Sequence, residues 1–343
     1  MTISAIVMAA GKGTRMKSEL PKPLHQARGR SMLAWVIHAL EGAEPEGVAI
    51  VVGHGSGQVK ASLDHDFDRQ FVFAEQLTQR GTGDAAAVGL SALDVHDNSF
   101  SDDDHVIVVP GDTPLLRSET IAEFVASHLA SGAAATLLTA TLDDPTNYGR
   151  VLRSANGQVS AVVEQRDGTA EQLAVSEVNT SIYCFRRSLL APALRLISTD
   201  NAQGEMYLTD AIGVLADAGH PIEAFEADAT EVTGVNDRAQ LTFAAEHLGR
   251  RIATAHMLNG VTIVQPSSTV IDASVTIEPD AIIHAATVLA GATTIGAGAV
   301  VGPSAHLVDA TIGAGAVVES SRVDGATVAP DDVIGPFAQL PSN

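Results

Sequence analysis

The chain has 343 residues, about twice the length of an average domain, and a formal net charge of −21. We therefore expect two domains. Hydrophobic residues make up 45% of the chain and aromatic residues only 4%, which is enough for a sizeable core built mainly from small aliphatic side chains. An acidic surface repels nucleic acid and anionic membranes, so neither is an expected partner. An anionic ligand would need a local positive site.

The sequence gives no sign of a membrane segment or a disulfide. No apolar run approaches the roughly 20 residues that span a bilayer. The one cysteine, Cys184, lies in the apolar run SIYCF and is interpreted as a buried structural thiol. These features predict a soluble, cytoplasmic protein.

Residues 1–236 alternate short β-branched runs with helical patterns, which predicts an α/β domain with a mainly parallel sheet covered on both faces. In such sheets, ligands bind beyond the carboxyl ends of the strands. The expected strands cover residues 4–10, 48–53, 71–75, 105–112 and 135–142, and the expected helices residues 31–40, 83–93 and 117–132.

A cationic loop follows the first expected strand. Three of the four lysines in the chain, Lys12, Lys17 and Lys22, lie within residues 8–25, together with Arg15. We expect Arg15 and Lys22 to neutralise a bound triphosphate. Lys17 is interpreted as a solvated bystander, and no role is assigned to Lys12.

The same loop contains two glycines, in the segment AAGKGTR. It matches neither the P-loop nor the dinucleotide-binding fingerprint. Even so, Gly11 and Gly13 allow the backbone to approach an anion, and their N–H groups can point at phosphate oxygens. A tight turn with solvated lysines is the alternative.

Asp112, in the segment VVPGDTPLL, ends the fourth expected strand. An aspartate beside a glycine at the carboxyl end of a strand is suited to bind Mg²⁺ at a phosphate site. A simple turn is the alternative interpretation of the same residues.

The C-terminal part of the chain has a different character. Residues 237–258 show helical apolar spacing and predict one long linking helix. From residue 259 to 343, aliphatic residues recur every five or six positions, which is the spacing of hexapeptide repeats and indicates a parallel β-helix. The aliphatic positions are Ile271, Ile277, Ile283, Leu289, Ile295, Val301, Leu307, Ile312, Val318, Val323, Val328 and Ile334.

A set of motifs now stands in one order along the chain: MAAGKGTRMKSELPKPLH, QLTQRGTGDA, PGDTPL, PTNYGRV, AVVEQRDG, EVNTSI, QGEMYLTD and VTGVNDR, followed by the repeats. In this order the chain resembles the bacterial bifunctional N-acetylglucosamine-1-phosphate uridyltransferase / glucosamine-1-phosphate acetyltransferase family. The resemblance implies a Rossmann-like nucleotidyltransferase domain, a linking helix and a short left-handed parallel β-helix.

The resemblance also implies a reaction and its site. The chain would transfer UMP from UTP to N-acetylglucosamine 1-phosphate with Mg²⁺, for cell-wall precursor synthesis. The implied roles are phosphate charge neutralisation by Arg15 and Lys22, nucleotide contacts by Met8, Ala9, Ala10, Gly11, Gly111 and Asp112, uracil recognition by Gln76, Gly81 and Thr82, sugar binding by Gly149, Glu164 and Asn179, and Mg²⁺ binding by Asp112 and Asn236.

Some of these residues have simpler interpretations. Glu164 could be a surface residue of a strand, Asn179 a turn former, and Asn236 the cap of the helix that begins near residue 237. In addition, Ser181 stands where the family usually has glycine, and Asp84 where histidine is frequent.

The repeats end soon after GPFA, where the family continues with the acetyl-transfer site. We therefore expect no acetyltransferase activity, and a homotrimer formed through the β-helix. The alternatives are a nucleotidyltransferase for another sugar 1-phosphate or for dTTP, a non-catalytic assembly protein, and an acyltransferase.

Overall fold

The computed structural model describes residues 1–53, 55–96 and 101–341. The chain divides into two compact units, the first formed by Met1–His25 and Met32–Asp237, the second by Gln26–Ser31 and Arg238–Asn343. Among the described residues, no helix combines the length and the apolar character needed to cross a bilayer.

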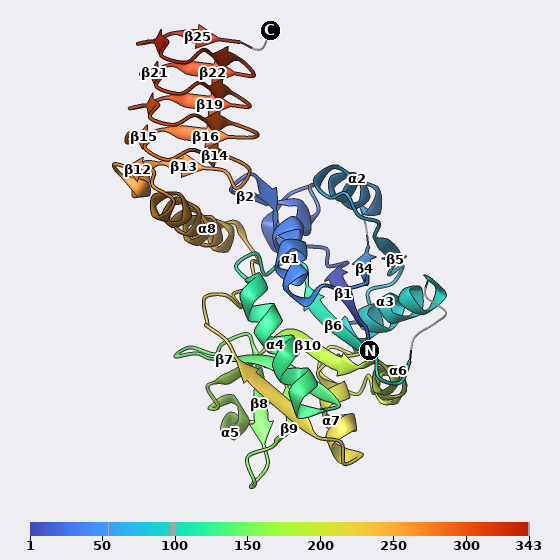
Figure 1. Cartoon of the computed structure of the whole chain (residues 1–343). Helices are drawn as coiled ribbons and strands as arrows, with labels where there is room; N and C mark the ends of the chain where they lie inside the picture. The colour runs from blue at the N-terminus through green and yellow to red at the C-terminus, as the bar shows by residue number, and fades with distance from the viewer. Residues whose placement is uncertain (54, 97–100, 342–343) are drawn as a thin grey trace. The chain divides into compact units, whose positions relative to one another are not determined.

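The first unit contains a nine-stranded sheet in the order β11-β7-β10-β6-β1-β4-β5, with β8 paired to β10 and β9 (Figure 1). The long strands are β-branched and aliphatic, as buried strands of parallel sheets require. The strands are β1 (Ile3–Ala9), β4 (Gly47–Val52), β5 (Val72–Glu75), β6 (His105–Pro110), β7 (Ala135–Thr141), β8 (Gly149–Arg153), β9 (Val159–Val163), β10 (Glu177–Arg186) and β11 (Ile222–Glu226).

Helices cover both faces of this sheet, and alternate residues of each strand face opposite sides. Val7 of β1 packs in one cluster with α1 and α4, whereas Ile6 packs in the other with α3, α6 and α7. The α/β prediction is confirmed. The helices are α1 (Met32–Leu40), α2 (Ser56–Asp66), α3 (Thr82–His96), α4 (Ser118–Ser131), α5 (Ala170–Leu173), α6 (Arg187–Leu196) and α7 (Asp210–Asp217), with 3-10 turns at Thr14–Met16, Lys22–Leu24 and Glu41–Ala43.

Strand β10 runs against the other long strands. It pairs antiparallel with both β6 and β7, whereas β1, β4, β5 and β6 pair in parallel. The beginning of β10 therefore lies at the edge of the sheet where the parallel strands end. The buried Cys184 lies on this strand, as predicted, and burial raises the pKa of its thiol.

The second unit contains α8 (Arg238–Leu258) and a left-handed parallel β-helix with three sheets of five, five and four short strands (Figure 1). Eleven of the twelve expected aliphatic positions are buried, and Ile334 is half-buried. The strands are β12 (Thr262–Ile263), β13 (Val270–Ile271), β14 (Thr276–Ile277), β15 (Ile282–Ile283), β16 (Val288–Ala290), β17 (Thr294–Ile295), β18 (Val300–Val301), β19 (His306–Val308), β20 (Thr311–Ile312), β21 (Val317–Val318), β22 (Arg322–Asp324), β23 (Thr327–Val328), β24 (Val333–Ile334) and β25 (Gln339–Leu340), with a 3-10 turn at Pro266–Ser268.

A small hairpin of β2 (Gln26–Ala27) and β3 (Arg30–Ser31) also belongs to the second unit. Arg28 Nε donates a hydrogen bond to the Ala245 carbonyl oxygen of α8 at 2.8 Å. The Arg28 guanidinium lies so close to Gly249 that a Cβ at this position would collide with it. The glycine within the long helix thus makes room for the hairpin.

Candidate active site

The candidate site forms where parallel strands of the first unit end. The backbone N–H of Gly111, after β6, donates to the Met8 carbonyl oxygen of β1 at 3.0 Å, and the N–H of Gln76, after β5, donates to Val52 of β4 at 2.8 Å. The loops after these four strands are therefore adjacent. Met8 and Ala9 end β1, and Ala10 and Gly11 follow it.

Four of the expected residues meet in one cationic cluster. Lys22 Nζ forms an ion pair with the Asp112 carboxylate and donates to Asn236 Oδ1 at 2.9 Å. Arg15 Nη2 donates to the same Asn236 oxygen at 2.8 Å. The cluster thus holds two cations and one carboxylate, with Asn236 Oδ1 shared by both cations, which gives a local positive charge in a chain whose net charge is −21. Such a cluster is suited to bind phosphate oxygens.

Backbone geometry brings these side chains together. Gly13 has a φ of 58°, and a Cβ there would collide with the aliphatic stem of Lys22. Glycine therefore allows both the left-handed turn and the passage of Lys22 across it. On the opposite side, the Val235 N–H donates to the Asp112 carbonyl oxygen at 2.9 Å, which holds Asn236 beside Asp112.

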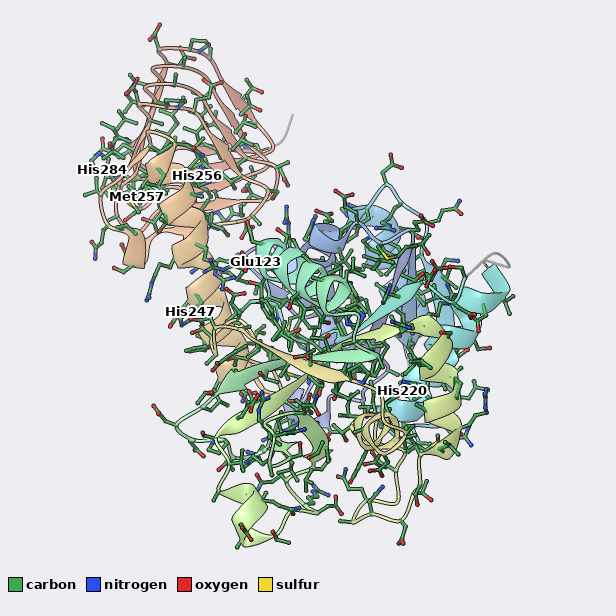
Figure 2. The ribbon with its side chains drawn as sticks, turned by 60° about the horizontal axis from the view of Figure 1, so that its bottom comes forward. Glu123, His220, His247, His256, Met257 and His284 are labelled. Atoms are coloured by element: carbon green, nitrogen blue, oxygen red, sulfur yellow. The ribbon has the colours of Figure 1, made fainter. Side chains whose placement is uncertain are left out.

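The oxygens of Asp112 and Asn236 converge on one cation, the Lys22 ammonium. One carboxylate and one amide oxygen form a partial ligand set, of the kind that Mg²⁺ completes with water and substrate phosphates. Within residues 1–53, 55–96 and 101–341, no three His, Cys, Asp or Glu side chains form a group that could hold a metal ion. In Figure 2, His247 and His256 lie on separate turns of α8 and do not form such a group. The Asp112 carboxylate and the Asn236 amide oxygen are therefore the candidate ligands, and they fit Mg²⁺ that is bound together with phosphates.

Gln76, Gly81 and Thr82 also lie together, at the start of α3. The buried Gln76 side chain donates from Nε2 to the Gly81 carbonyl oxygen at 3.2 Å and to Asp84 Oδ2 at 2.8 Å. Thr82 Oγ1 accepts a hydrogen bond from the Leu208 N–H at 2.9 Å. The sequence identified Asp84 only as a departure from the family pattern, and its contact with Gln76 is a new observation.

The segment around Met206 holds the turn before α3. Gly81 has a φ of 112°, and a Cβ there would collide with the Met206 carbonyl oxygen. That oxygen accepts a hydrogen bond from the Gly83 N–H at 2.7 Å. The Gln79 side chain donates to the Ala10 carbonyl oxygen. The turn is therefore joined to the end of β1.

The three residues expected to hold the sugar are placed by β8, β9 and β10. Gly149 begins β8 and is paired with Asn179 of β10, while Glu164 directly follows β9. Asn179 Nδ2 donates to the Tyr183 hydroxyl at 2.7 Å, and its Oδ1 is buried without a hydrogen-bond partner. A buried acceptor of this kind is costly unless a ligand donates to it.

Glu164 is half-buried and lies near other acidic side chains. Its Oε1 accepts a hydrogen bond from the Thr209 hydroxyl at 3.1 Å. Burial raises the pKa of the Glu164 carboxyl, and the neighbouring charges of Asp210 and Asp167 add to the rise. Thr209 lies in the motif QGEMYLTD, and the sequence pattern alone assigns no role to this residue.

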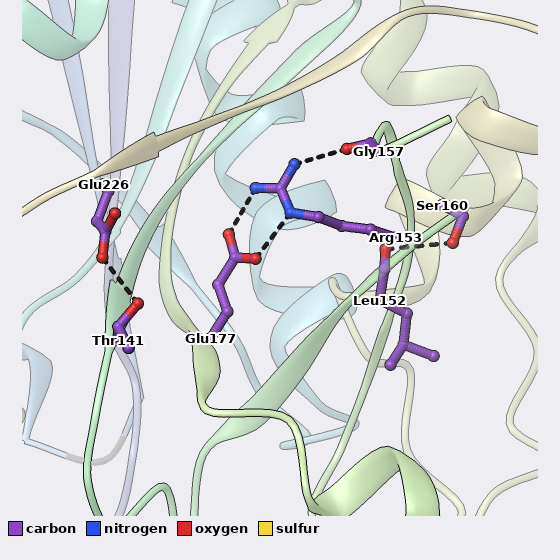
Figure 3. A network of polar contacts seen from close by, with 7 residues as sticks. All are labelled: Thr141, Leu152, Arg153, Gly157, Ser160, Glu177 and Glu226. Carbon is purple, nitrogen blue, oxygen red and sulfur yellow. Dashed lines mark hydrogen bonds and ion pairs between the residues drawn. The ribbon is translucent and has the colours of Figure 1, made fainter. Parts of the chain in front are cut away.

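The β8–β9 hairpin is braced against β10 (Figure 3). Arg153 of β8 binds both carboxylate oxygens of Glu177 of β10, at 2.8 and 2.7 Å, and donates to the Gly157 carbonyl oxygen at 2.9 Å. Paired guanidinium–carboxylate hydrogen bonds fix orientation as well as distance. This brace fixes the hairpin that carries Gly149.

Ser181 has a φ of 63° and lies where the register of β10 shifts between Asn179 and Ile182. This backbone conformation suits glycine far better than serine. The backbone at Ser181 therefore fits the glycine that the resemblance implies at this position.

Tyr148 lies between Gly149 and the region of Asp112. Burial raises the pKa of its hydroxyl, and the charge of Asp112 adds to the rise. Tyr148 directly precedes Gly149, in the motif PTNYGRV, and is a residue that sequence reasoning missed. Its aromatic character in a motif of polar and glycine residues was the available signal.

Residues 5–211, which include the cationic loop after β1, match the family described as the MobA-like NTP transferase domain. This part of the chain is therefore a nucleotidyltransferase domain. The solved structure of UDP-glucose pyrophosphorylase complexed with UDP-glucose superposes with a TM-score of 0.59 over 73% of this chain and 100% of that chain, at 14% identity. That similarity concerns the fold.

Closer relatives identify the family. The chain is 45% identical to bifunctional protein GlmU of Streptomyces avermitilis, over 98% of this chain and 69% of the relative. It is 42% identical to the protein of the same name from Corynebacterium efficiens, over 98% and 69%, and 45% identical to that of Mycolicibacterium vanbaalenii, over 98% and 68%. The chain belongs to the GlmU family, which confirms the resemblance carried by the motif order.

Proposed function

We propose that the chain transfers UMP from UTP to N-acetylglucosamine 1-phosphate, giving UDP-N-acetylglucosamine and pyrophosphate. The observation that carries this proposal is the convergence of Arg15, Lys22, Asp112 and Asn236 at the ends of β1 and β6. Membership of the GlmU family supports the same choice of substrates.

In the proposed reaction, a phosphate oxygen of the sugar phosphate attacks the α-phosphorus of UTP. The bond from that phosphorus to the bridging oxygen breaks, and pyrophosphate leaves on the opposite side. No covalent bond to the protein forms, so the chain acts by positioning and by charge neutralisation. Arg15 and Lys22 would offset the negative charge that grows on the leaving pyrophosphate.

Asp112 and Asn236 would hold Mg²⁺ together with the phosphates of the substrates. The ion would neutralise phosphate charge and favour an in-line arrangement. Gln76 and the turn at Gly81 and Thr82 would bind the base, and backbone groups of Met8, Ala9, Ala10, Gly11 and Gly111 would line the nucleotide.

Gly149, Glu164 and Asn179 would bind the N-acetylglucosamine part. Glu164 can accept from sugar hydroxyls, and the unpartnered Oδ1 of Asn179 can accept from a hydroxyl or from the acetamido N–H. Glucose 1-phosphate lacks the acetamido group, so it would leave part of this site unused.

The test is a Mg²⁺-dependent pyrophosphate-release assay with UTP and dTTP, each combined with N-acetylglucosamine 1-phosphate or glucose 1-phosphate. We expect the highest kcat/KM for UTP with N-acetylglucosamine 1-phosphate. A higher value for any other pair would replace the proposed substrates. Adding acetyl-CoA and glucosamine 1-phosphate tests the expectation that the chain does not acetylate, which stays a prediction.

A further inference from the structure

The Gln76 side chain has no hydrogen atom left with which to donate to a ligand. Its amide nitrogen carries two hydrogens, and the two acceptors beside it are the Gly81 carbonyl oxygen at 3.2 Å and Asp84 Oδ2 at 2.8 Å. Both acceptors face the same nitrogen, so the orientation of the amide is determined. The Gln76 Oε1 atom is the part of the group that remains for a ligand, and it can only accept.

Asp84 is itself held so that it acts only as an acceptor. One carboxylate oxygen receives the Gln76 hydrogen bond, and Oδ1 forms an ion pair with Arg80 at 3.1 Å. Asp84 also lies in the first turn of α3, where the helix dipole favours a negative charge. Gln76 and Asp84 are both buried, at 6% and 7% exposure, so water competes little for their hydrogen bond.

We propose that Asp84 is a positioning residue that determines base specificity, by fixing the Gln76 amide with its oxygen toward the nucleotide. The inference rests on the proposed function, in which Gln76 faces the base. Uracil carries an N–H at N3, which can donate to Gln76 Oε1. Cytosine has an unprotonated acceptor nitrogen at the same position, so the two acceptors would repel each other.

The proposed selectivity separates uracil from cytosine and not uracil from thymine, because thymine has the same N3–H. A site built to accept from one ligand hydrogen rejects an analogue that lacks it by a large factor, since the buried acceptor is then left unpaired. We expect the wild-type chain to prefer UTP to CTP by about 100-fold or more in kcat/KM.

The test is the ratio of kcat/KM for UTP to that for CTP, each with N-acetylglucosamine 1-phosphate, in the wild type and in Asp84→Asn. Asparagine has almost the same size as aspartate, but it replaces one acceptor oxygen with an N–H donor. The Gln76 side-chain amide can then flip, so that its nitrogen and oxygen exchange places. We expect the ratio to fall at least tenfold. Both kcat/KM values are measured on the same preparation, so the fraction of folded protein cancels in their ratio.

The control is Arg80→Ala, which removes the other partner of Asp84 and leaves the carboxylate facing Gln76. We expect its UTP/CTP ratio to stay within about threefold of the wild type. A purely structural role of Asp84 would lower kcat/KM for both nucleotides and leave the ratio of Asp84→Asn unchanged, which would overturn the inference. An equal fall of the ratio in Arg80→Ala would also overturn it.

The wild-type arm separates the two proposals. A wild type that uses UTP and CTP equally would overturn the role of Asp84 and leave nucleotidyl transfer to N-acetylglucosamine 1-phosphate standing. A wild type that releases no pyrophosphate with either nucleotide would overturn the proposed function together with the inference.

Discussion

Lys22 and Asp112 form an ion pair that joins the loop after β1 to the loop after β6. The same ammonium donates to Asn236 Oδ1. The two residues expected to bind Mg²⁺ thus already hold a cation that belongs to the chain. A metal ion and the Lys22 ammonium would compete for the same two side chains, Asp112 and Asn236.

Replacing Lys22 by methionine removes this competitor. We expect Lys22→Met to bind Mn²⁺ more tightly than the wild type in the absence of nucleotide, as measured by electron paramagnetic resonance of the unbound ion. Turnover should fall about 100-fold, because a charge that stabilises the leaving pyrophosphate is lost. Lys17→Met, at an exposed lysine of the same loop, is the control and should change neither quantity. Weaker Mn²⁺ binding by Lys22→Met would contradict the competition.

Tyr183 holds the amide of Asn179 through the 2.7 Å hydrogen bond to its hydroxyl. Tyr183→Phe keeps the ring and removes this acceptor, which costs about 1 kcal/mol at a buried amide. We expect the KM for N-acetylglucosamine 1-phosphate to rise about fivefold, with the KM for UTP unchanged as an internal control. Equal rises in both KM values would argue against a specific role on the sugar side.

Ser181 occupies a backbone conformation that costs a non-glycine residue about 1–2 kcal/mol. Because glycine also loses more entropy on folding, we expect Ser181→Gly to stabilise the chain by about 0.5–1 kcal/mol in urea unfolding. Ser4→Gly, in the regularly paired strand β1, is the matched control and should destabilise it by about 1 kcal/mol. A destabilised Ser181→Gly variant would show that the serine hydroxyl matters more than the strain.

Two buried histidines predict a loss of stability in mild acid. His128 contacts His105 at 2.9 Å and the Thr136 hydroxyl at 2.7 Å. Burial lowers the pKa of His128 to about 4, and the charges of His105 and Arg186 add to the effect. Between pH 6.5 and 4 the unfolded chain therefore binds the proton and the folded chain does not, so stability falls as the pH falls.

From pH 7.5 to 5.0, His128 alone should remove about 2 kcal/mol from the free energy of unfolding. Urea unfolding followed by the fluorescence of Trp35, the only tryptophan, measures this in the first unit. His128→Gln is less stable at neutral pH and should lack this part of the pH dependence. The same pH dependence in wild type and variant would show that His128 is not its source.

Periodic parts of the fold could be predicted from the sequence. The hexapeptide spacing follows directly from the inward-pointing residue of each short strand, and the apolar runs mark the buried parallel strands. The position of β10 could not be predicted, because an apolar run carries no information about direction or neighbours. The packing of the Gln26–Ser31 hairpin in the second unit could not be predicted either. It depends on the contact of Arg28 with α8 at Gly249, and these two residues are far apart in the sequence.

The sequence predicted the main residues of the candidate site but not the contacts between their side chains. Motif order indicated Arg15, Lys22, Asp112 and Asn236, and the structure brings them together. The contact of Asp84 with Gln76 and the hydrogen bond of Tyr183 to Asn179 depend on side-chain geometry within a turn and a bulged strand. Spacing along the sequence does not specify such geometry.

The most direct test of the central claim is pyrophosphate release from UTP and N-acetylglucosamine 1-phosphate by the wild type and by Asp112→Ala. We expect Mg²⁺-dependent release by the wild type, with UDP-N-acetylglucosamine as the second product. We expect a turnover at least 100-fold lower in a folded Asp112→Ala variant. Near-normal turnover in Asp112→Ala, or no release by the wild type, would contradict the assignment of the site.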